Sequence, residues 1–164
     1  SSPTVIKGID NALSNMVFTT GNILEPSFGV GNFFGLLPEE MSGSKLYGVG
    51  LDSLSGQIAK QLYPHADIQN VGYERSELPD NFFDVVIGNI PFGSYKVSDK
   101  RYNNLTYNIH DYFIAKSLDK VRADGVIAVV TSSGTMDKQN PSVRRYIAQR
   151  AGLLGAIRLP NNAF

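Results

Sequence analysis

The chain has 164 residues, in which 15 Lys and Arg are balanced by 15 Asp and Glu, with two His and no Cys. This length suits one domain with a single core, and the absence of Cys excludes disulfides and thiolate metal sites. No apolar run reaches the ~18 residues of a membrane span and no signal peptide opens the chain, so we expect a cytoplasmic protein without a metal.

The neutral total conceals an uneven distribution of charge. Residues 1–95 carry ten acidic and four basic side chains, a net charge of −6, whereas residues 96–164 carry five acidic and eleven basic ones, a net charge of +6. Such a split is typical of a basic face that meets nucleic acid, although it also arises by chance.

In the first half of the chain, strand-like runs alternate with helix-period segments. Ser2-Pro3 resembles an N-cap followed by a first-turn proline, which predicts a helix through about Met16. The following segments are expected to be a strand at Asn22–Leu24, a helix at Asn32–Leu37, a strand at Lys45–Leu51, a helix at Leu54–Leu62, and strands at Ala66–Val71 and Phe82–Gly88. In the helix at Leu54–Leu62, Leu54, Ile58 and Leu62 share one apolar face of the kind that packs on a core.

The second half opens with Asn89–Tyr107, a long polar stretch of the kind that is functional or mobile in compact domains. It is followed by a helix at Ile109–Val121, a strand at Gly125–Thr131, a helix at Pro141–Arg150 and a strand at Leu153–Leu159. Alternating strands and helices predict an α/β fold, with a parallel sheet covered by helices on both faces. Ligands bind such sheets at the carboxyl ends of the strands.

A glycine loop, Glu25-Pro26-Ser27-Phe28-Gly29-Val30-Gly31, follows the first predicted strand and precedes a helix. Glycine lets the backbone turn tightly and approach a ligand, although an ordinary strand-to-helix turn has the same composition. A dinucleotide fingerprint fits poorly, because the third glycine, Gly35, comes one position too late. No Gly-Lys-Ser/Thr occurs, which excludes a Walker loop.

A second motif, Asn89-Ile90-Pro91-Phe92, directly follows the strand at Phe82–Gly88. Asn89 offers a side-chain carbonyl oxygen, Pro91 stiffens the loop, and Phe92 offers an aromatic face. Together they suit the exocyclic amine of a planar ring, although a turn whose Phe packs into the core is the simpler alternative.

With both motifs in this order, the chain resembles S-adenosylmethionine-dependent amino-methyltransferases such as the N6-adenine DNA methyltransferases. The glycine loop resembles their acid-Pro-x-x-Gly-x-Gly cofactor loop, Asn89–Phe92 resembles their Asn-Pro-Pro-Phe/Tyr motif, and Ser2-Pro3-Thr4 resembles the end of their N-terminal motif. Val130–Thr135 and Ile157–Asn161 resemble methylase subunits of restriction-modification systems and methylase modules of mobile elements.

This resemblance implies a Rossmann-like methyltransferase core over residues 1–164, truncated at the C-terminus, that acts on DNA and takes target recognition from further domains or subunits. Its expected cofactor is S-adenosylmethionine, bound by Thr4, Glu25, Pro26, Ser27, Gly29, Gly31, Asp52, Glu74 and Asn89. The expected catalytic residues are Asn89, Ile90, Pro91 and Phe92. A flipped adenine would stack on Phe92 while the Asn89 side chain and the Ile90 carbonyl accept hydrogen bonds from N6.

One departure from the family concerns the second strand. Relatives have Gly-Val-Glu-Leu-Asp where this chain has Gly48-Val49-Gly50-Leu51-Asp52, so the acid that binds the ribose hydroxyls is missing. Losing such a contact costs roughly 1.5–3 kcal/mol, and Asp52 lies on the same side of an extended strand as position 50. On this basis Gly50→Glu is expected to strengthen cofactor binding.

Two other functions stay open: methylation of a protein glutamine or an RNA base, and a non-catalytic binding module. His65 and the pair His110-Asp111 are expected to be exposed rather than catalytic. Two further groups match either a nucleic-acid surface or ordinary solvated residues. They are Tyr95, Tyr102, Tyr107 and Tyr112 mixed with Lys96, Lys100 and Arg101, and the helix residues Arg144, Arg145 and Arg150.

Overall fold

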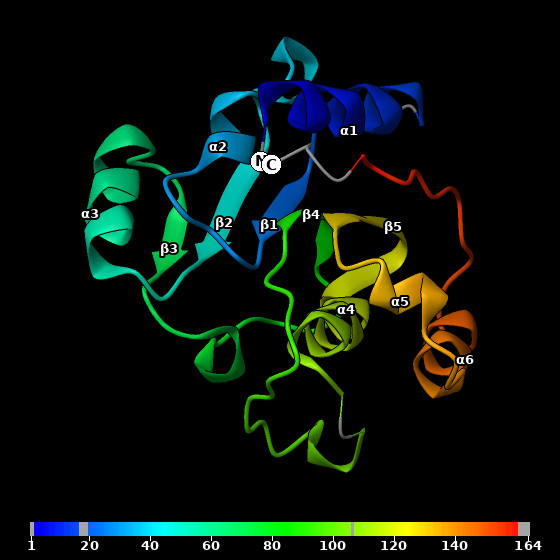
Figure 1. Cartoon of the computed structure of the whole chain (residues 1–164). Coiled ribbons are helices and arrows are strands. Elements are labelled where there is room, and N and C mark those ends of the chain that lie inside the picture. The colour runs from blue at the N-terminus through cyan, green and yellow to red at the C-terminus, as the bar shows by residue number, and fades with distance from the viewer. Residues whose placement is uncertain (1, 17–19, 106, 161–164) are drawn as a thin grey trace.

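A parallel sheet with helices on both faces makes up most of the computed structural model, which describes residues 2–16, 20–105 and 107–160 (Figure 1). The elements, in chain order, are α1 (Pro3–Asn15), β1 (Asn22–Glu25), α2 (Asn32–Gly35), β2 (Lys45–Val49), α3 (Ser53–Leu62), β3 (Asp67–Gln69), β4 (Phe83–Asn89), α4 (Ile109–Lys120), β5 (Val121–Val130), α5 (Gly134–Asp137) and α6 (Ser142–Ala148). Short 3-10 helices lie at Glu39–Met41, Tyr73–Arg75 and Asn103–Leu105.

The five strands form one sheet in the order β3-β2-β1-β4-β5, and every neighbouring pair is parallel. The chain starts in the middle of the sheet, moves outward to β3, and then crosses to β4 on the other side of β1. The order therefore reverses between β1 and β4, the place where open α/β sheets bind ligands. The carboxyl ends of these two strands carry Glu25 and Asn89.

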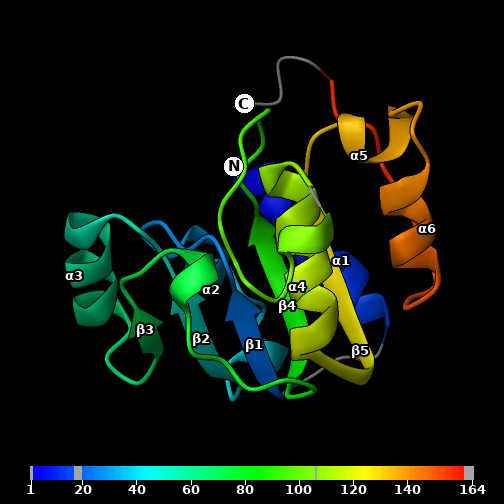
Figure 2. The ribbon, with the colours of Figure 1, turned by 90° about the horizontal axis from the view of Figure 1, so that it is seen from below.

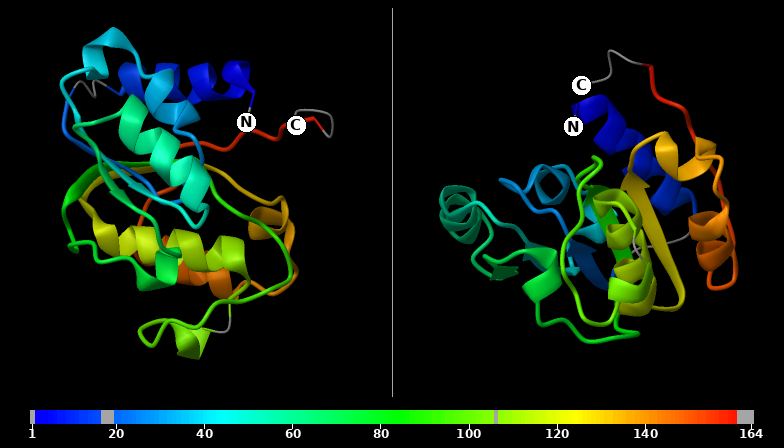
Figure 3. Two further views of the ribbon diagram at one scale, coloured as in Figure 1. Left: turned by 90° about the vertical axis from the view of Figure 1, so that its left-hand side faces the viewer. Right: turned by 60° about the horizontal axis from the view of Figure 1, so that its bottom comes forward.

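Side chains of β1 and β4 alternate between two cores, one on each face of the sheet. Leu24 and Val86 pack into the core under α4, whereas Ile23, Val85 and Ile87 pack into the core under α1, α2 and α3. Figure 2 shows α4 in front of β4, and Figure 3 shows α1 on the opposite side of the sheet. The prediction of a parallel sheet covered on both faces is confirmed.

The face that α3 turns toward the sheet differs from the predicted one. Leu54, Ile58 and Leu62 are exposed by 64%, 41% and 60%, whereas Gly56 and Ala59 are buried. A Cβ added to Gly56 would lie 3.2 Å from the Asn70 side-chain oxygen, so only small residues let the helix lie this close to the chain after β3. The expectation that the leucine stripe faces the core is therefore wrong.

The predicted strand at Leu153–Leu159 is also wrong, because residues 151–160 form no regular secondary structure. Leu153, Leu154 and Ile157 are exposed by 72%, 71% and 89%, and Figure 1 draws this segment as an extended coil after α6. β-propensity stabilises a strand only when a neighbouring strand pairs with it, and this segment has none. The other predicted elements are present, with ends that differ by a few residues.

The structure also bears on membranes and metals. No described helix is long and apolar enough to cross a bilayer. Within residues 2–16, 20–105 and 107–160, no three His, Asp or Glu side chains gather where they could hold a metal ion.

Candidate active site

β1 ends in a buried carboxyl group at the point where the strand order reverses. Glu25 is 3% exposed, its Oε2 has no hydrogen-bond partner among the described residues, and burial raises its pKa well above the ordinary value. A Cβ on Gly88 of β4 would lie 3.3 Å from the Glu25 Cγ and 3.7 Å from the Pro26 Cδ, so glycine lets β4 approach the start of the loop. A cation bound beside such a carboxyl group stabilises its charged form.

The glycine loop is fixed at one glycine and open at the other. Gly31, the N-cap of α2, has φ +82°, and a Cβ there would also collide with the ring of Tyr63. The hydroxyl of Tyr63, just after α3, donates to the Gly31 carbonyl at 2.9 Å. Gly29 is exposed, and nothing lies within 4 Å of where its Cβ would be. The loop backbone is therefore accessible at Gly29.

Phe28 holds the same loop against the end of β2. Its N–H donates to the Val49 carbonyl at 2.6 Å, and its ring packs 4.8 Å from the ring of Phe34. A Cβ on Gly50 would overlap the Phe28 carbonyl oxygen and would lie 3.2 Å from the carbonyl carbon. Gly50 is thus a position where the loop leaves no room for a side chain, and not simply a position that has lost an acid.

The Asn89–Phe92 motif places different chemistry at each residue. Asn89 Oδ1 is buried and has no partner among the described residues. Ile90 is 1% exposed and its N–H donates to the Val130 carbonyl at 3.1 Å, which fixes the motif to β5. Pro91 is half-buried, whereas the Phe92 ring is 55% exposed. The exposure of Phe92 argues against the alternative in which this ring fills the core.

The remaining predicted cofactor residues lie in the glycine loop, at the N-cap of α3, after β3 and in α1. Ser27 is half-buried, within the glycine loop. Asp52 is exposed and its Oδ2 accepts a hydrogen bond from the Ser55 N–H at 2.8 Å, which caps α3. Hydrogen bonding by the side chain and then the backbone of Ser55 lowers the pKa of Asp52. Glu74 lies on the 3-10 helix after β3, 3.8 Å from the Arg75 guanidinium, and Thr4 is exposed in the first turn of α1. Their roles stay predictions.

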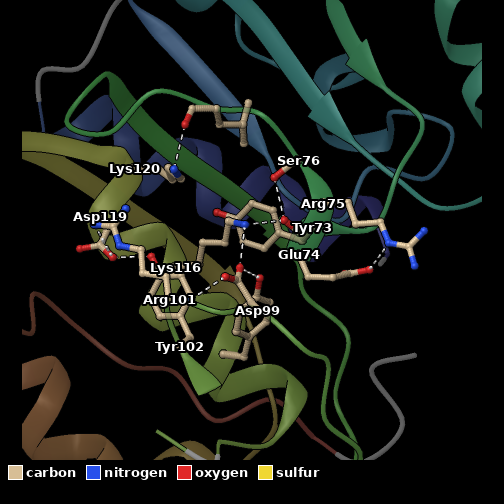
Figure 4. A network of polar contacts seen from close by, with 12 residues as sticks. Tyr73, Glu74, Arg75, Ser76, Asp99, Arg101, Tyr102, Lys116, Asp119 and Lys120 are labelled. Atoms are coloured by element: carbon tan, nitrogen blue, oxygen red, sulfur yellow. Dashed lines mark hydrogen bonds and ion pairs between the residues drawn. The ribbon is translucent and has the colours of Figure 1, made fainter. Parts of the chain in front are cut away.

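The chain that leaves the motif is anchored to α4 by buried polar contacts (Figure 4). Asp99 accepts hydrogen bonds from the Tyr112 hydroxyl at 2.7 Å and from Lys116 Nζ at 3.0 Å. Lys116 is 5% exposed and also donates to the Tyr73 carbonyl at 2.7 Å. The N–H of Ile109, the first residue of α4, donates to the Tyr95 carbonyl at 2.9 Å. Most of the long polar stretch is thus held against the domain.

The expectation that His110 and Asp111 are exposed is wrong. They are 5% and 1% exposed, and His110 Nε2 lies 3.7 Å from Asp111 Oδ1. His110 Nδ1 and both Asp111 oxygens have no hydrogen-bond partner among the described residues, and burial raises the pKa of Asp111. The physical reason is that the start of α5 lies against the start of α4: a Cβ on Gly134 would lie 3.8 Å from His110 Nε2.

Other expected surface residues divide between surface and interior. Tyr102 and Tyr112 are 7% and 4% exposed, Tyr107 is half-buried and Tyr95 is 54% exposed. His65 is exposed, as predicted. On α6 and just after it, Arg144 is half-buried, Arg145 is exposed, and Arg150 lies 3.6 Å over the Tyr146 ring. Sequence reasoning missed the anchoring role of Lys116, whose only signal was a Lys inside an apolar helix.

The sequence of this chain is similar to one family of methylases and to one curated protein. Residues 61–164 match the model of the Eco57I restriction-modification methylase family. The Defense against restriction protein B of Escherichia phage P1 is 33% identical over 150 residues, which are 88% of this chain but only 6% of that protein. The chain thus spans a small part of the curated relative that it matches.

Two solved structures share the fold. A Listeria monocytogenes protein assigned to the class I S-adenosylmethionine-dependent methyltransferases has 16% identity and a TM-score of 0.70, over 88% of this chain and 49% of that one. A modification subunit assigned to a type I restriction enzyme of Vibrio vulnificus has 17% identity and a TM-score of 0.66, over 86% of this chain and 36% of that one.

The sheet order, the open glycine loop and the motif after β4 define the fold of the S-adenosylmethionine-dependent methyltransferases. The chain belongs to the Eco57I restriction-modification methylase family. Family and fold both agree with the predicted cofactor, S-adenosylmethionine.

Proposed function

We propose that this chain transfers a methyl group from S-adenosylmethionine to the N6 amine of adenine in DNA, in the cytoplasm. The observation that carries the proposal is that Asn89 Oδ1, which is buried and has no partner among the described residues, lies with the exposed ring of Phe92 at the carboxyl end of β4. A buried acceptor without a partner is costly, and an exocyclic amine supplies the missing N–H donor. The exposed ring offers the face on which the base stacks.

The residues at the carboxyl end of β1 and in the glycine loop fit the cofactor. S-adenosylmethionine carries a positively charged sulfonium and an ammonium group, and one oxygen of the buried Glu25 has no partner in the part of the chain that the structure describes. The backbone is open at Gly29 and rigid at Gly31, so the loop can follow a ligand closely. Asp52 and Glu74 would serve the ribose and adenine end. When bound, the cofactor supplies an electrophilic methyl group.

The protein's part in the reaction is positioning and electrostatics. The Asn89 oxygen and the Ile90 carbonyl would accept hydrogen bonds from the two N–H groups of N6, which increases the electron density on that nitrogen. Burial strengthens these bonds, because few waters compete for them and the local dielectric is low. Stacking on the ring of Phe92 would fix the plane of the base.

DNA as the substrate is supported by the family and by its relatives. The family consists of restriction-modification methylases, and the Vibrio vulnificus neighbour is a modification subunit of this kind. Because the chain spans only 6% of the phage relative, we also propose that further domains or subunits supply the choice of DNA site.

The test is methyl transfer from radiolabelled S-adenosylmethionine to duplex DNA, RNA or protein. Wild-type chain should label DNA, and Asn89→Ala should lose at least a hundredfold in rate while its affinity for the cofactor, measured by calorimetry, changes less than threefold. Asn11→Ala, an exposed amide on α1, is the matched control and should keep both.

Each other outcome selects a different function. Label in RNA or protein alone would assign the site to another planar nitrogen and overturn the DNA proposal. Absence of cofactor binding at millimolar concentration would favour a non-catalytic module. Equal loss of cofactor affinity and rate in Asn89→Ala would contradict the role given to Asn89.

A further inference from the structure

A cavity of about 380 Å³ lies beside the chain that leaves the catalytic motif. Its walls come from residues 96–98, 102–103 and 107 and from Tyr112 of α4. A second hollow of about 360 Å³ shares Tyr102 with it and is lined by Arg101, Tyr146 and Arg150 among others. The first volume lies at the lower end of the range for small-molecule sites, which suits one nucleotide.

The walls of the first cavity are aromatic and firmly held. The hydroxyls of Tyr102 and Tyr112 donate to Asp119 and Asp99, so these tyrosines contribute rings rather than hydroxyls. Their ring centroids lie 5.6 Å apart in an edge-to-face arrangement. Tyr107, the third tyrosine of the cavity, packs edge-to-face against Tyr146 at 5.7 Å. The cavity is thus lined by rings whose positions are fixed before a ligand arrives.

Polar donors complete the lining. The Asn103 side-chain oxygen accepts a hydrogen bond from the Asp99 N–H at 2.9 Å, which leaves its amide NH₂ as a donor. Ser98 adds a hydroxyl and Lys96 an exposed ammonium group. Rings combined with an amide, a hydroxyl and a cation match a planar heterocycle with a polar edge and a phosphate nearby.

The position of the cavity connects it to the proposed reaction. Phe92, the last residue of the motif, and Tyr95 carry exposed rings and come just before Lys96, the first residue of the cavity lining, in the chain. Exposed aromatic residues interspersed with basic ones are typical of surfaces that bind unpaired bases. On the basis of the proposed function, we propose that this cavity holds a second, unpaired nucleobase of the DNA substrate, with its phosphate at Lys96.

The test compares two single-stranded deoxyoligonucleotides of 12 nucleotides, one of mixed sequence and one that is abasic throughout, by fluorescence anisotropy. Wild-type chain should bind the first about tenfold more tightly. Tyr107→Leu removes the ring and should abolish most of this preference without changing affinity for the abasic strand. Lys96→Ala should weaken binding of the mixed strand at least threefold more than Lys100→Ala, which removes the same charge from the same segment outside the cavity.

Because Lys96 is exposed, its variant keeps the test valid even where Tyr107→Leu unfolds the chain. No binding by wild-type chain, equal effects of the two lysine variants, or tighter binding of the matching ribo-oligonucleotide would each overturn the inference. A methyl-transfer assay distinguishes failure of the cavity proposal from failure of the proposed function. If DNA is methylated but the lysine variants have the same KM for DNA, only the cavity proposal fails. If no DNA is methylated while the binding differences persist, only the proposed function fails.

Discussion

Replacing Gly50 with Ala should force the glycine loop away from β2. The added Cβ overlaps the Phe28 carbonyl oxygen, which must move by about 1 Å to restore an ordinary C···O separation of about 3.3 Å. This shift breaks the 2.6 Å bond from the Phe28 N–H to the Val49 carbonyl, worth about 1 kcal/mol, and disturbs the packed Phe28 ring. Overpacking of this kind costs about 1–3 kcal/mol, so we expect a total loss of about 2–4 kcal/mol.

The assay is urea unfolding followed by circular dichroism, with Gly29→Ala as the matched control. Gly29 lies in the same loop with nothing within 4 Å of its Cβ position, so its alanine variant should change the free energy of unfolding by less than about 1 kcal/mol. The family resemblance alone predicts that Gly50→Glu tightens cofactor binding. The structure predicts that it destabilises the chain at least as much as Gly50→Ala. A Gly50→Ala variant within 0.5 kcal/mol of wild type would refute the steric argument.

Two further variants test buried charges. Lys116→Met leaves the Asp99 carboxylate without its cation and should lower the free energy of unfolding by about 3–5 kcal/mol. The control Lys60→Met, at an exposed position, should lower it by less than about 0.5 kcal/mol. A loss below about 1 kcal/mol for Lys116→Met would contradict the anchoring role. Burial raises the pKa of Asp10 from 3.8 to about 6, so its contribution to stability is present below pH 3.8 and lost as the pH rises through 6. As the pH rises from 4 to 7, the free energy of unfolding of Asp10→Asn, measured by urea unfolding, should therefore increase by about 2–3 kcal/mol relative to that of wild type. A difference that does not change with pH would show that Asp10 has the same pKa in the folded and the unfolded chain.

The parts of the fold that could be predicted are those in which local pattern and tertiary environment agree. Phe82–Gly88 is predicted as a strand buried on both faces because it is an apolar run, and the observed strand β4, Phe83–Asn89, places side chains in both apolar cores. The motifs were found because a parallel sheet brings the ends of its strands to one edge. Sequence order alone therefore places Glu25 and Asn89 at that edge.

The errors arise where the tertiary environment overrides local pattern. The leucine stripe of α3 has helical periodicity, but close approach to the chain near Asn70 favours the side with Gly56. Leu153–Leu159 has the composition of a strand, but strand formation depends on a pairing partner that no local pattern specifies. His110 is polar at a helix start, yet it is buried, with Gly134 of α5 beside it. Which helix covers which surface is information that a single sequence does not contain.

Several basic residues of the second half form ion pairs with acidic residues of the first half. Part of the positive excess joins the halves together, because Lys120 and Arg101 pair with Asp80 at 2.7 Å and Arg122 pairs with Asp84. These pairs stabilise the fold and offer little to a phosphate.

Within residues 96–164, six basic residues have no carboxylate partner among the described residues, and none of the six lies in a strand. They are Lys96, Lys100, Lys138, Arg144, Arg145 and Arg150. All six lie in the segment after Asn89–Phe92 or in the chain from α5 to just beyond α6, and Lys96 and Arg150 line the two cavities. A neutral chain can therefore present positive charge on the segment after Asn89–Phe92 and around α6, because acidic residues pair with other basic residues.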